Sequence, residues 1–439
     1  PRVEHALSGA GWQANGSESV EAREAIDASL GGNGGYAIQV AVHSDQLSYR
    51  DEPFAETVRR TRAELAADDA VAQVSRPQRG SSISPDGRTV LIQAGAAADP
   101  NEMVDAATRL KEKLPEAAAA GVEVDLTGAP GMWSDFNEAN KEAMLRSELI
   151  SWPVTLAILV LAFGSLVAAG LPLMLTILGL VSSAGVLYLG TEISPISIWA
   201  LNFALMFALA LGIDYALFIV MRFRNALFGQ GEDPARAVAT TMDTAGKAVL
   251  FSGITVLISL SAVLLVPSPA FRSMSLGIMV SVLFVLAATL TLLPAVLAKL
   301  GPRVDRLGLP WAHSGEHRSE RFARWGERLW RRPLLYGGVA LVALVGLALP
   351  VTALDTGMPS IKVVPEADGS RQGYERIQEA FGPGAPGTLQ VVAPQDQAAD
   401  ASAALAADSG IALVAPAQAG ADGLALIQAV PIDDPSSPL

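Results

Sequence analysis

The chain has 439 residues, of which 51% are hydrophobic, and it carries a formal net charge of −13. Residues 1–148 and 355–439 are acidic, with net charges of −10 and −8, whereas residues 149–354 carry +5. This distribution excludes a nucleic-acid binder, which needs a concentrated basic face, and the absence of cysteine excludes disulfides and Cys metal sites.

The first part of the chain, residues 1–148, predicts an α+β domain. Tyr36, Ile38, Val40 and Val42 alternate with smaller or polar residues, which is the period-two pattern of a strand. Two strand–helix–strand units are expected, at 36–42, 52–67 and 71–75, then at 89–95, 101–114 and 122–127. This βαβ–βαβ order predicts a ferredoxin-like split fold. Because the sequence starts in polar residues without an initiator Met, we also expect it to be a fragment.

Six apolar runs follow, each about 20 residues long, which is the length needed to cross a bilayer core. A helix over 132–148 is expected to lead into the first of them. The runs lie at about 150–169, 171–190, 196–221, 247–266, 273–298 and 333–354. We therefore predict an α-helical polytopic membrane bundle, with five spans within residues 149–300 and a sixth span at 333–354.

The positions of Lys and Arg predict the orientation of these spans. The loop after the third span and the stretch 299–332 are rich in basic residues, whereas the loops 190–196 and 266–273 hold one between them. Under the positive-inside rule the basic stretches are cytoplasmic. Residues 1–148 and 355–439 are then extracytoplasmic.

Residues 301–332 form a predicted cytoplasmic basic segment. Within it, HRSERFARWGERLWRR (317–332) places Phe322, Trp325 and Leu329 at helical spacing among arginines. This pattern indicates an amphipathic helix that lies on the inner leaflet. A solvated helix that packs on its own protein remains the alternative.

Two stretches of the chain repeat each other. AIDASLGGNGGYAIQV (25–40) aligns without a gap with RIQEAFGPGAPGTLQV (376–391), and both indicate a helix, a Gly-rich turn and a strand. Parallel repeats of this size are a known transporter design. The repeat predicts that the span 333–354 opens a second half and that residues 355–439 are the truncated start of a second outer domain. The rest of that half is expected to lie outside this sequence.

Asp214 is the only acidic or basic residue in the interior of any predicted span. An ionised carboxylate there costs at least about 2.5–3.5 kcal/mol, and a group that bears this cost is usually functional. Desolvation would raise its pKa, which suits a group that binds and releases a proton near neutral pH. Tyr215 adds a hydroxyl to such a proton relay. The alternative is a structural carboxyl that bonds a neighbouring helix.

Small and polar residues surround this acid. Ala204, Ala208, Gly212 and Ala216 fall at every fourth position and predict a close helix–helix contact, with chance spacing as the alternative. The next span carries hydroxyls at i, i+3 and i+7, namely Ser252, Thr255 and Ser259. This polar stripe suits hydrogen bonding to a carboxylate, although membrane Ser and Thr often bond only their own backbone.

Other chemistry is not indicated by the sequence. No G-x-x-x-x-G-K-[ST] loop is present, because Gly246-Lys247 lacks the flanking residues, and no G-x-S-x-G elbow appears. His313 and His317 have an i,i+4 spacing but lie in an Arg-rich stretch, so we predict a solvated surface there. We therefore expect no metal site, no cofactor and no enzymatic activity, and an ion gradient as the source of energy for transport.

Three strings resemble the MmpL family of the RND transporter superfamily: GIDYALFIVMRFR (212–224), TAGKAVLFSGITV (244–256) and LLPAVLAKLG (292–301). The resemblance covers nearly the whole chain and implies porter-type outer domains and proton-driven export of lipids or other amphiphiles across a bacterial plasma membrane. Asp214 and Tyr215 match the family's first Asp-Tyr pair, and Ser252 matches a neighbouring hydroxyl. The resemblance places a second Asp-Tyr pair in the half that this sequence lacks.

The leading hypothesis is that protonation of Asp214 shifts helix packing and moves the outer domains, which carry the substrate. The expected partners are the lipid bilayer, protons, an amphiphilic substrate and the second half of the polypeptide. Two alternatives stay open: a lipid- or sterol-sensing scaffold, and a protein-translocation helper of the same superfamily. The scaffold would tolerate changes at Asp214, whereas the exporter would not.

Overall fold

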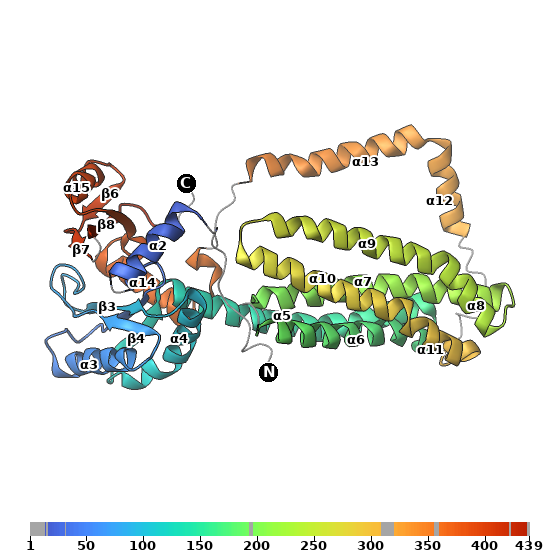
Figure 1. Ribbon diagram of the computed structural model, residues 1–439, viewed down its shortest axis with the longest axis horizontal. Coiled ribbons are helices and arrows are strands. Elements are labelled where there is room, and N and C mark those ends of the chain that lie inside the picture. The colour runs from blue at the N-terminus through green and yellow to red at the C-terminus, as the bar shows by residue number, and fades with distance from the viewer. Residues whose placement is uncertain are drawn as a thin grey trace.

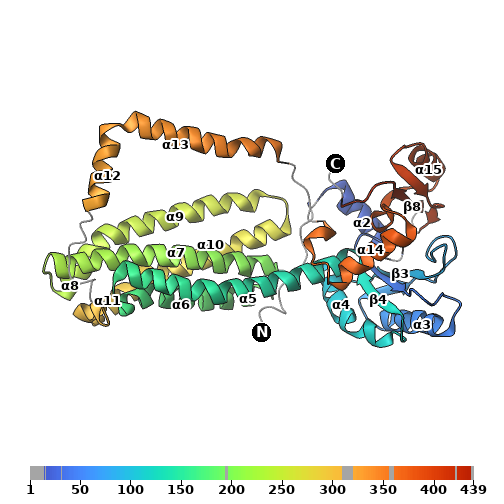
Figure 2. The same ribbon diagram turned by 180° about the vertical axis from the view of Figure 1, so that it is seen from behind.

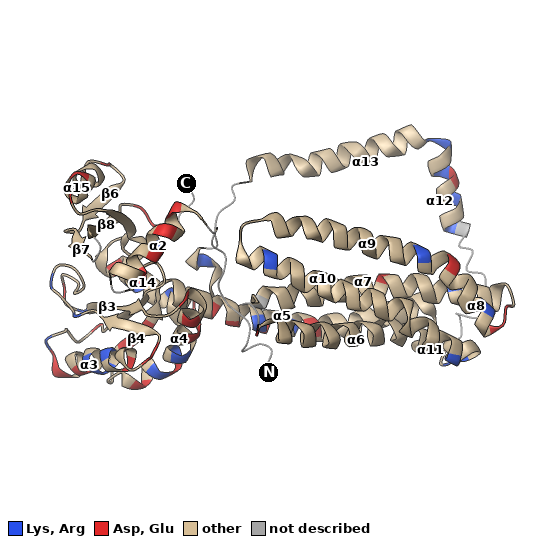
Figure 3. Cartoon of the chain, in the orientation of Figure 1, with Lys and Arg blue, Asp and Glu red and all other residues tan. Residues whose placement is uncertain are grey.

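The computed structural model describes residue 14 and residues 16–30, 32–192, 196–308, 320–354, 360–420 and 423–436. An outer α/β region and a long helical region lie end to end along the molecule (Figure 1). Acidic and basic residues gather in the outer region and at the far end of the helices, and few lie along the helices themselves (Figure 3). The expected histidine pair, His313 and His317, lies outside the described residues.

The first outer sheet has four antiparallel strands in the order β2-β3-β1-β4. The strands are β1 (Ile38–His43), β2 (Val71–Val74), β3 (Thr89–Ala96) and β4 (Glu123–Thr127), and the helices between them are α3 (Glu52–Ala66) and α4 (Pro100–Lys113). All the strands and helices that the alternating pattern predicted in this region are present. Apolar side chains such as Ile38, Val40 and Ile92 are fully buried between the sheet and the helices.

The second outer sheet reproduces the pairing of the first. Its strands are β5 (Leu389–Pro394), β6 (Ile411–Val414), β7 (Gln418–Ala419) and β8 (Leu424–Pro431), with α15 (Ala398–Ala406) between β5 and β6. The order β5-β8-β6 corresponds to β1-β3-β2, and Leu389 pairs with Ala429 as Ile38 pairs with Ala94. The register shift in β2 between Val71 and Gln73 recurs in β6. The repeat seen in the sequence is therefore also a repeat of strand register.

Two equivalent helices cross between these units. Helix α2 (Glu18–Ser29) and helix α14 (Gly369–Phe381) begin 351 residues apart, which is also the offset between the repeated stretches 25–40 and 376–391. Helix α14 packs on β4 and α5 of the first unit, whereas α2 contacts β5 of the second. Near α2, the Asn33 carbonyl accepts a hydrogen bond from Gln390 Nε2 at 2.6 Å. Each unit thus lends a helix to the other (Figure 2).

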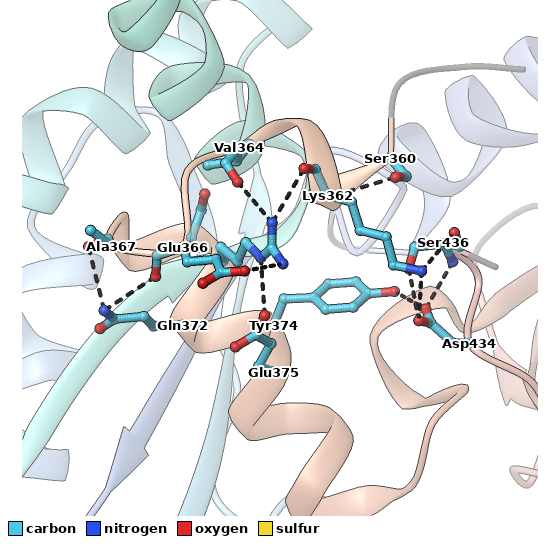
Figure 4. Close-up of polar contacts among 12 residues, drawn as sticks. Ser360, Lys362, Val364, Glu366, Ala367, Gln372, Tyr374, Glu375, Asp434 and Ser436 are labelled. Carbon is cyan, nitrogen blue, oxygen red and sulfur yellow. Dashed lines mark hydrogen bonds and ion pairs between the residues drawn. The ribbon is translucent and has the colours of Figure 1, made fainter.

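Polar contacts tie the start of the second unit to its last described residues (Figure 4). The Tyr374 hydroxyl donates to Asp434 Oδ1 at 2.8 Å, and the Ser436 backbone N–H donates to the same oxygen at 2.8 Å. Lys362 Nζ lies 3.7 Å from Asp434 Oδ2. Burial opposes the ionised form of Asp434, but the hydrogen bonds from Ser436 and Tyr374 outweigh it and lower the pKa of Asp434 to about 2.

The membrane region contains, within the described residues, six helical runs that are long and apolar enough to cross a bilayer. Their main helices are α5 (Gly128–Phe163), α6 (Leu166–Gly190), α7 (Ile198–Arg224), α9 (Lys247–Ser261), α10 (Pro269–Leu290) and α13 (Pro333–Ala348). Short helices α8 (Pro234–Thr241), α11 (Leu292–Leu300) and α12 (Glu320–Arg331) lie at the end far from the sheets (Figure 1). The residues predicted as a lead-in helix, 132–148, are part of α5.

The predicted boundary between the first two spans is wrong. The first two spans were placed at 150–169 and 171–190, but α5 ends at Phe163 because Gly164 adopts a left-handed conformation with φ of 66°. Ser165 then caps α6 by accepting from the Ala168 N–H at 3.3 Å. The fifth span, predicted at about 273–298, lies within one helical run, Pro269–Asp305, which is interrupted at Thr291 because Pro294 cannot supply a backbone N–H to the helix.

The spans differ in how closely they pack. Helices α6, α7 and α10 pack on one another, and 44%, 39% and 44% of the residues in their apolar 18-residue stretches are buried. In the corresponding stretches of the runs that contain α9 and α13, only 11% and 0% of the residues are buried. Helix α12 forms over most of the predicted amphipathic segment and leaves Phe322 and Trp325 exposed, with their rings in edge contact at 6.4 Å.

Candidate functional site

Helix α7 carries the candidate relay and has two unlike faces. It starts at the Ser197 cap, whose hydroxyl accepts from the Trp199 N–H at 3.3 Å, and ends in the basic residues Arg222 and Arg224. One face is buried against α6 and α10. The other face is exposed over Met206, Ala210, Asp214, Phe218 and Met221, and we call these five residues the open stripe.

The buried face of α7 is the small-residue face. Ala204, Ala208 and Ala216 are 0% exposed, and Gly212 is also buried. A Cβ on Gly212 would lie 2.6 Å from Thr176 Oγ1 of α6, so only glycine fits there without a shift of that side chain.

Contacts with α10 are equally close. A Cβ on Gly277 of α10 would lie 2.8 Å from the Ala200 carbonyl oxygen. The Ser281 hydroxyl donates to the Ala204 carbonyl at 3.0 Å across the same contact. Small residues therefore let three helices approach to backbone distance on this side.

Asp214 lies in the middle of the open stripe and is exposed. Within the described chain, its carboxylate makes no hydrogen bond and no ion pair. Four apolar residues flank it along the same side of the helix. Among the described residues no bond joins this carboxylate to a neighbouring helix, as the alternative of a structural carboxyl would require.

Tyr215 points away from Asp214, into the core formed by α6, α7 and α10. Its side chain is 4% exposed, and its hydroxyl has no hydrogen-bond partner among the residues that the structure describes. A buried hydroxyl without a partner costs about 1–3 kcal/mol and calls for an explanation. The structure therefore places the two predicted relay groups on different faces of α7.

The third predicted relay residue, Ser252, lies on α9 and is exposed, as are Thr255 and Ser259 of the same stripe. The Thr255 hydroxyl donates to the Phe251 carbonyl of its own helix at 2.8 Å. No hydrogen bond joins Ser252 to Asp214 in the described residues. This hydroxyl stripe and the open stripe are both left uncovered by the described chain.

Sequence reasoning missed two polar clusters that fix the ends of this bundle. At the outer end, buried Asp135 of α5 accepts from the Ser370 N–H at 2.9 Å and lies 2.7 Å from Lys111 Nζ. At the far end, Arg224 Nη1 donates to the Phe163 carbonyl at 2.7 Å, and its Nε lies 2.7 Å from Asp305 Oδ1. Neither cluster follows a motif, because the partners are far apart in sequence.

No group of three or more potential metal ligands occurs in the part of the chain that was described. The groups present at the candidate site are one uncovered carboxyl and one buried phenol on α7, and a row of hydroxyls on α9.

Comparison with known proteins finds membrane proteins that are similar in sequence to this chain, in agreement with the six apolar helical runs of its described residues. A profile of the MMPL family matches residues 11–336. A membrane protein of Streptomyces coelicolor, SCO6666, is 35% identical over 334 residues, which is 74% of this chain and 46% of that protein. The mycolic acid-containing lipids exporter MmpL11 of Mycolicibacterium smegmatis is 30% identical over 408 residues, or 90% of this chain and 42% of that protein.

The trehalose monomycolate exporter MmpL3 of the same organism is 30% identical over 288 residues, which is 60% of this chain and 28% of that protein. The chain belongs to the MMPL family. It spans about half the length of the curated relatives that it matches.

Proposed function

We propose that this chain is part of a secondary transporter that exports lipids or other amphiphiles and is driven by the proton gradient. The observation that carries the proposal is the unpartnered Asp214 on the open stripe of a membrane-spanning helix. Two relatives, MmpL11 and MmpL3, are named as lipid exporters. The sequence offers no phosphate-binding loop that would favour ATP as the source of energy.

A second membrane half would cover the open stripe. An exposed carboxylate that faced lipid would cost at least about 2.5–3.5 kcal/mol, so Asp214 belongs at a protein contact or a water-filled path. The sequence repeat places the span α13 ahead of the second outer unit, and we assign this span to the start of that half. An equivalent Asp-Tyr pair, at the corresponding position of the second half, would complete the relay with Asp214, Tyr215 and Ser252.

We assign the outer region to two porter-type, ferredoxin-like domains on the extracytoplasmic side of a bacterial plasma membrane. The strand order β2-β3-β1-β4 with helices after β1 and β3 supports this fold for residues 1–148. Residues 355–439 are the start of the second domain, and the basic segment 301–332 is cytoplasmic. The excess of Lys and Arg at the far end of the helices supports this orientation.

Contacts between α7 and the outer region offer a route for motion. Trp199, at the start of α7, packs against Phe136 of α5, with ring centroids 5.7 Å apart. The residue before Phe136 is Asp135, which holds the first turn of α14 through the Ser370 N–H. Helix α5 has 36 residues and is about 54 Å long, so one stiff element joins the membrane to both outer units. A shift of α7 on protonation of Asp214 would reach α14 by this route.

The test is the substitution Asp214→Asn in the protein with both halves, with export of a fluorescent lipid analogue measured in proteoliposomes under an imposed pH gradient. We expect export to fall to background, because the amide cannot bind and release a proton. Asp214→Glu, which keeps a titratable group, serves as the matched variant and should retain part of the activity. Equal membrane insertion of all three proteins is the control. Normal gradient-driven export by the Asn variant would refute the relay.

A further inference from the structure

A cleft of about 560 Å³ opens at the end of α7 that lies far from the sheets. Its lining comes from the last two turns of α7, from the π-helical turns Asn225–Gly229 and Met242–Gly246, from Ala248 of α9 and from Asp305. Such widened turns occur often at functional sites. The cleft is distinct from the candidate relay, because Asp214 and Ser252 do not line it.

One wall of the cleft is apolar. Phe218 and Met221 contribute the last two residues of the open stripe, and Phe228 adds a second aromatic ring. All three side chains are exposed, with 66%, 40% and 37% of their surface accessible. This wall runs along the outside of a membrane-spanning helix, so it can accept an acyl chain.

The polar side of the cleft holds Arg222, the one cation of its lining that has no carboxylate partner among the described residues. Arg222 Nε donates to Thr244 Oγ1 at 3.0 Å, which fixes the plane of the guanidinium. No carboxylate pairs with Arg222 in the described residues. The other arginine of the cleft, Arg224, lies 2.7 Å from Asp305 Oδ1, so these two charges offset each other. The nearby Lys247 pairs with Asp243.

We propose that this cleft binds an anionic phospholipid, with the headgroup phosphate on Arg222 and one acyl chain along Phe218 and Met221. A guanidinium held by its Nε presents its two Nη groups to a phosphate oxygen pair, and charge-assisted hydrogen bonds of this kind are strong and geometrically specific. A basic pocket between spans is a typical headgroup site. The apolar wall favours a lipid over free phosphate. Because Phe218 and Met221 end the open stripe, the bound chain would lie at the base of the contact with the second membrane half.

The experiment measures the affinity of the purified chain for phosphatidylglycerol in detergent by native mass spectrometry, with phosphatidylcholine as the neutral comparison. We expect one bound phosphatidylglycerol per chain, with an affinity at least about tenfold above that of phosphatidylcholine. Arg222→Gln should remove this preference. Arg303→Gln is the matched control, because Arg303 is exposed at the same end but does not line the cleft, and it should keep the preference.

Two further measurements test for misfolding and for binding of free phosphate. Arg222→Lys keeps the positive charge but loses the two parallel N–H donors of the guanidinium, so it should retain a weaker preference for phosphatidylglycerol. Such a retained preference would show that the loss in Arg222→Gln does not come from misfolding. Inorganic phosphate should not compete with the lipid at millimolar concentration. Equal binding of the two lipids, equal loss in Arg222→Gln and Arg303→Gln, or full competition by inorganic phosphate would each overturn the proposal.

Discussion

In the outer region, helices of the two repeated units cross over and cover each other's sheets, whereas in the membrane region α7 keeps one long side uncovered. Helix α14 buries Ser370 completely and places its first turn on Asp135 of the other unit. The open stripe of α7 has no such cover, and its one charged group has no partner in the described chain. Where parts of both repeats are present, the Ser370 N–H and Gln390 Nε2 find acceptors in the other unit. Under the proposed function, a second membrane half would cover the surface around Asp214 in the same way.

The largest effect on stability is expected on the packed side of the membrane region. In Gly277→Leu the new Cβ would lie 2.8 Å from the Ala200 carbonyl oxygen, and backbone atoms cannot move aside cheaply. We expect a loss of about 3 kcal/mol or more from this overpacking. Thermal unfolding of the purified chain in detergent measures it.

Gly185→Leu is the matched control on α6, because no atom lies within 4 Å of a Cβ at Gly185. This variant should unfold near the temperature of the parent chain. Equal losses in the two variants would show that the contact between α7 and α10 is not close in solution.

The second effect concerns the crossing helix in the outer region. Asp135→Ala removes the carboxylate that accepts from the Ser370 N–H and leaves Lys111 with Glu138 as its only described partner. A lost buried hydrogen bond of this kind costs about 2 kcal/mol. We expect faster amide exchange at the start of α14, measured by hydrogen–deuterium exchange mass spectrometry.

Glu138→Ala is the control, because Glu138 also contacts Lys111 but its side chain is 70% exposed. It should leave exchange in α14 nearly unchanged. Unchanged exchange in Asp135→Ala as well would mean that α14 is held in place by apolar contacts alone.

The alternating and helical patterns were sufficient to predict the first outer sheet, because each strand buries one face and so shows its period in the sequence. The repeat was also visible in the sequence, and its alignment fits the equivalent starts of α2 and α14. The exchange of these helices was not visible, because a sequence pattern reports which face is buried but not which sheet covers it. The same limit applies to Asp135, whose partner Ser370 lies 235 residues away.

In the membrane region, hydropathy located the spans but not their ends. Gly164 and Ser165 end α5 and start α6 within an apolar run, so the composition alone gives no boundary there. Asp214 was found because one charge in an apolar helix is conspicuous. That it would face outward from this chain, with Tyr215 facing inward, could not be predicted, because orientation depends on which helices α7 packs against.

A smaller effect is expected from pH at the contact between α14 and β4. Burial raises the pKa of Asp125 to about 6. Arg376 Nε lies 2.7 Å from Asp125 Oδ2, but its N–H does not point at that oxygen and so does not offset the effect of burial. The folded chain therefore holds a proton that the unfolded chain releases above about pH 4, so stability falls as pH rises from about 4 to 6. The unfolding temperature of the parent chain should drop relative to Asp125→Asn over this range.

Asp69→Asn is the control, because Asp69 is exposed and makes no contact with Arg376 in the described residues. This variant keeps Asp125, so its unfolding temperature should fall over the same pH range as that of the parent chain. A parent chain that gained stability over the same pH range would show that Arg376 binds the ionised carboxylate. The outer crossing contact would then be an ion pair and not a buried neutral carboxyl.

The smallest effect in this chain is expected on the open stripe itself. Ala210 lies one turn before Asp214 and is exposed, so Ala210→Leu should change the free energy of unfolding of the chain by less than about 0.5 kcal/mol. In the protein with both halves, the same leucine would enter the proposed contact beside the relay and should lower gradient-driven export several-fold. The pair of measurements, unfolding of this chain and export by the complete protein, separates a lipid-facing surface from a buried one. If export were unaffected, the open stripe would face lipid at Ala210, and Asp214 would have to reach its proton through water on another side of α7.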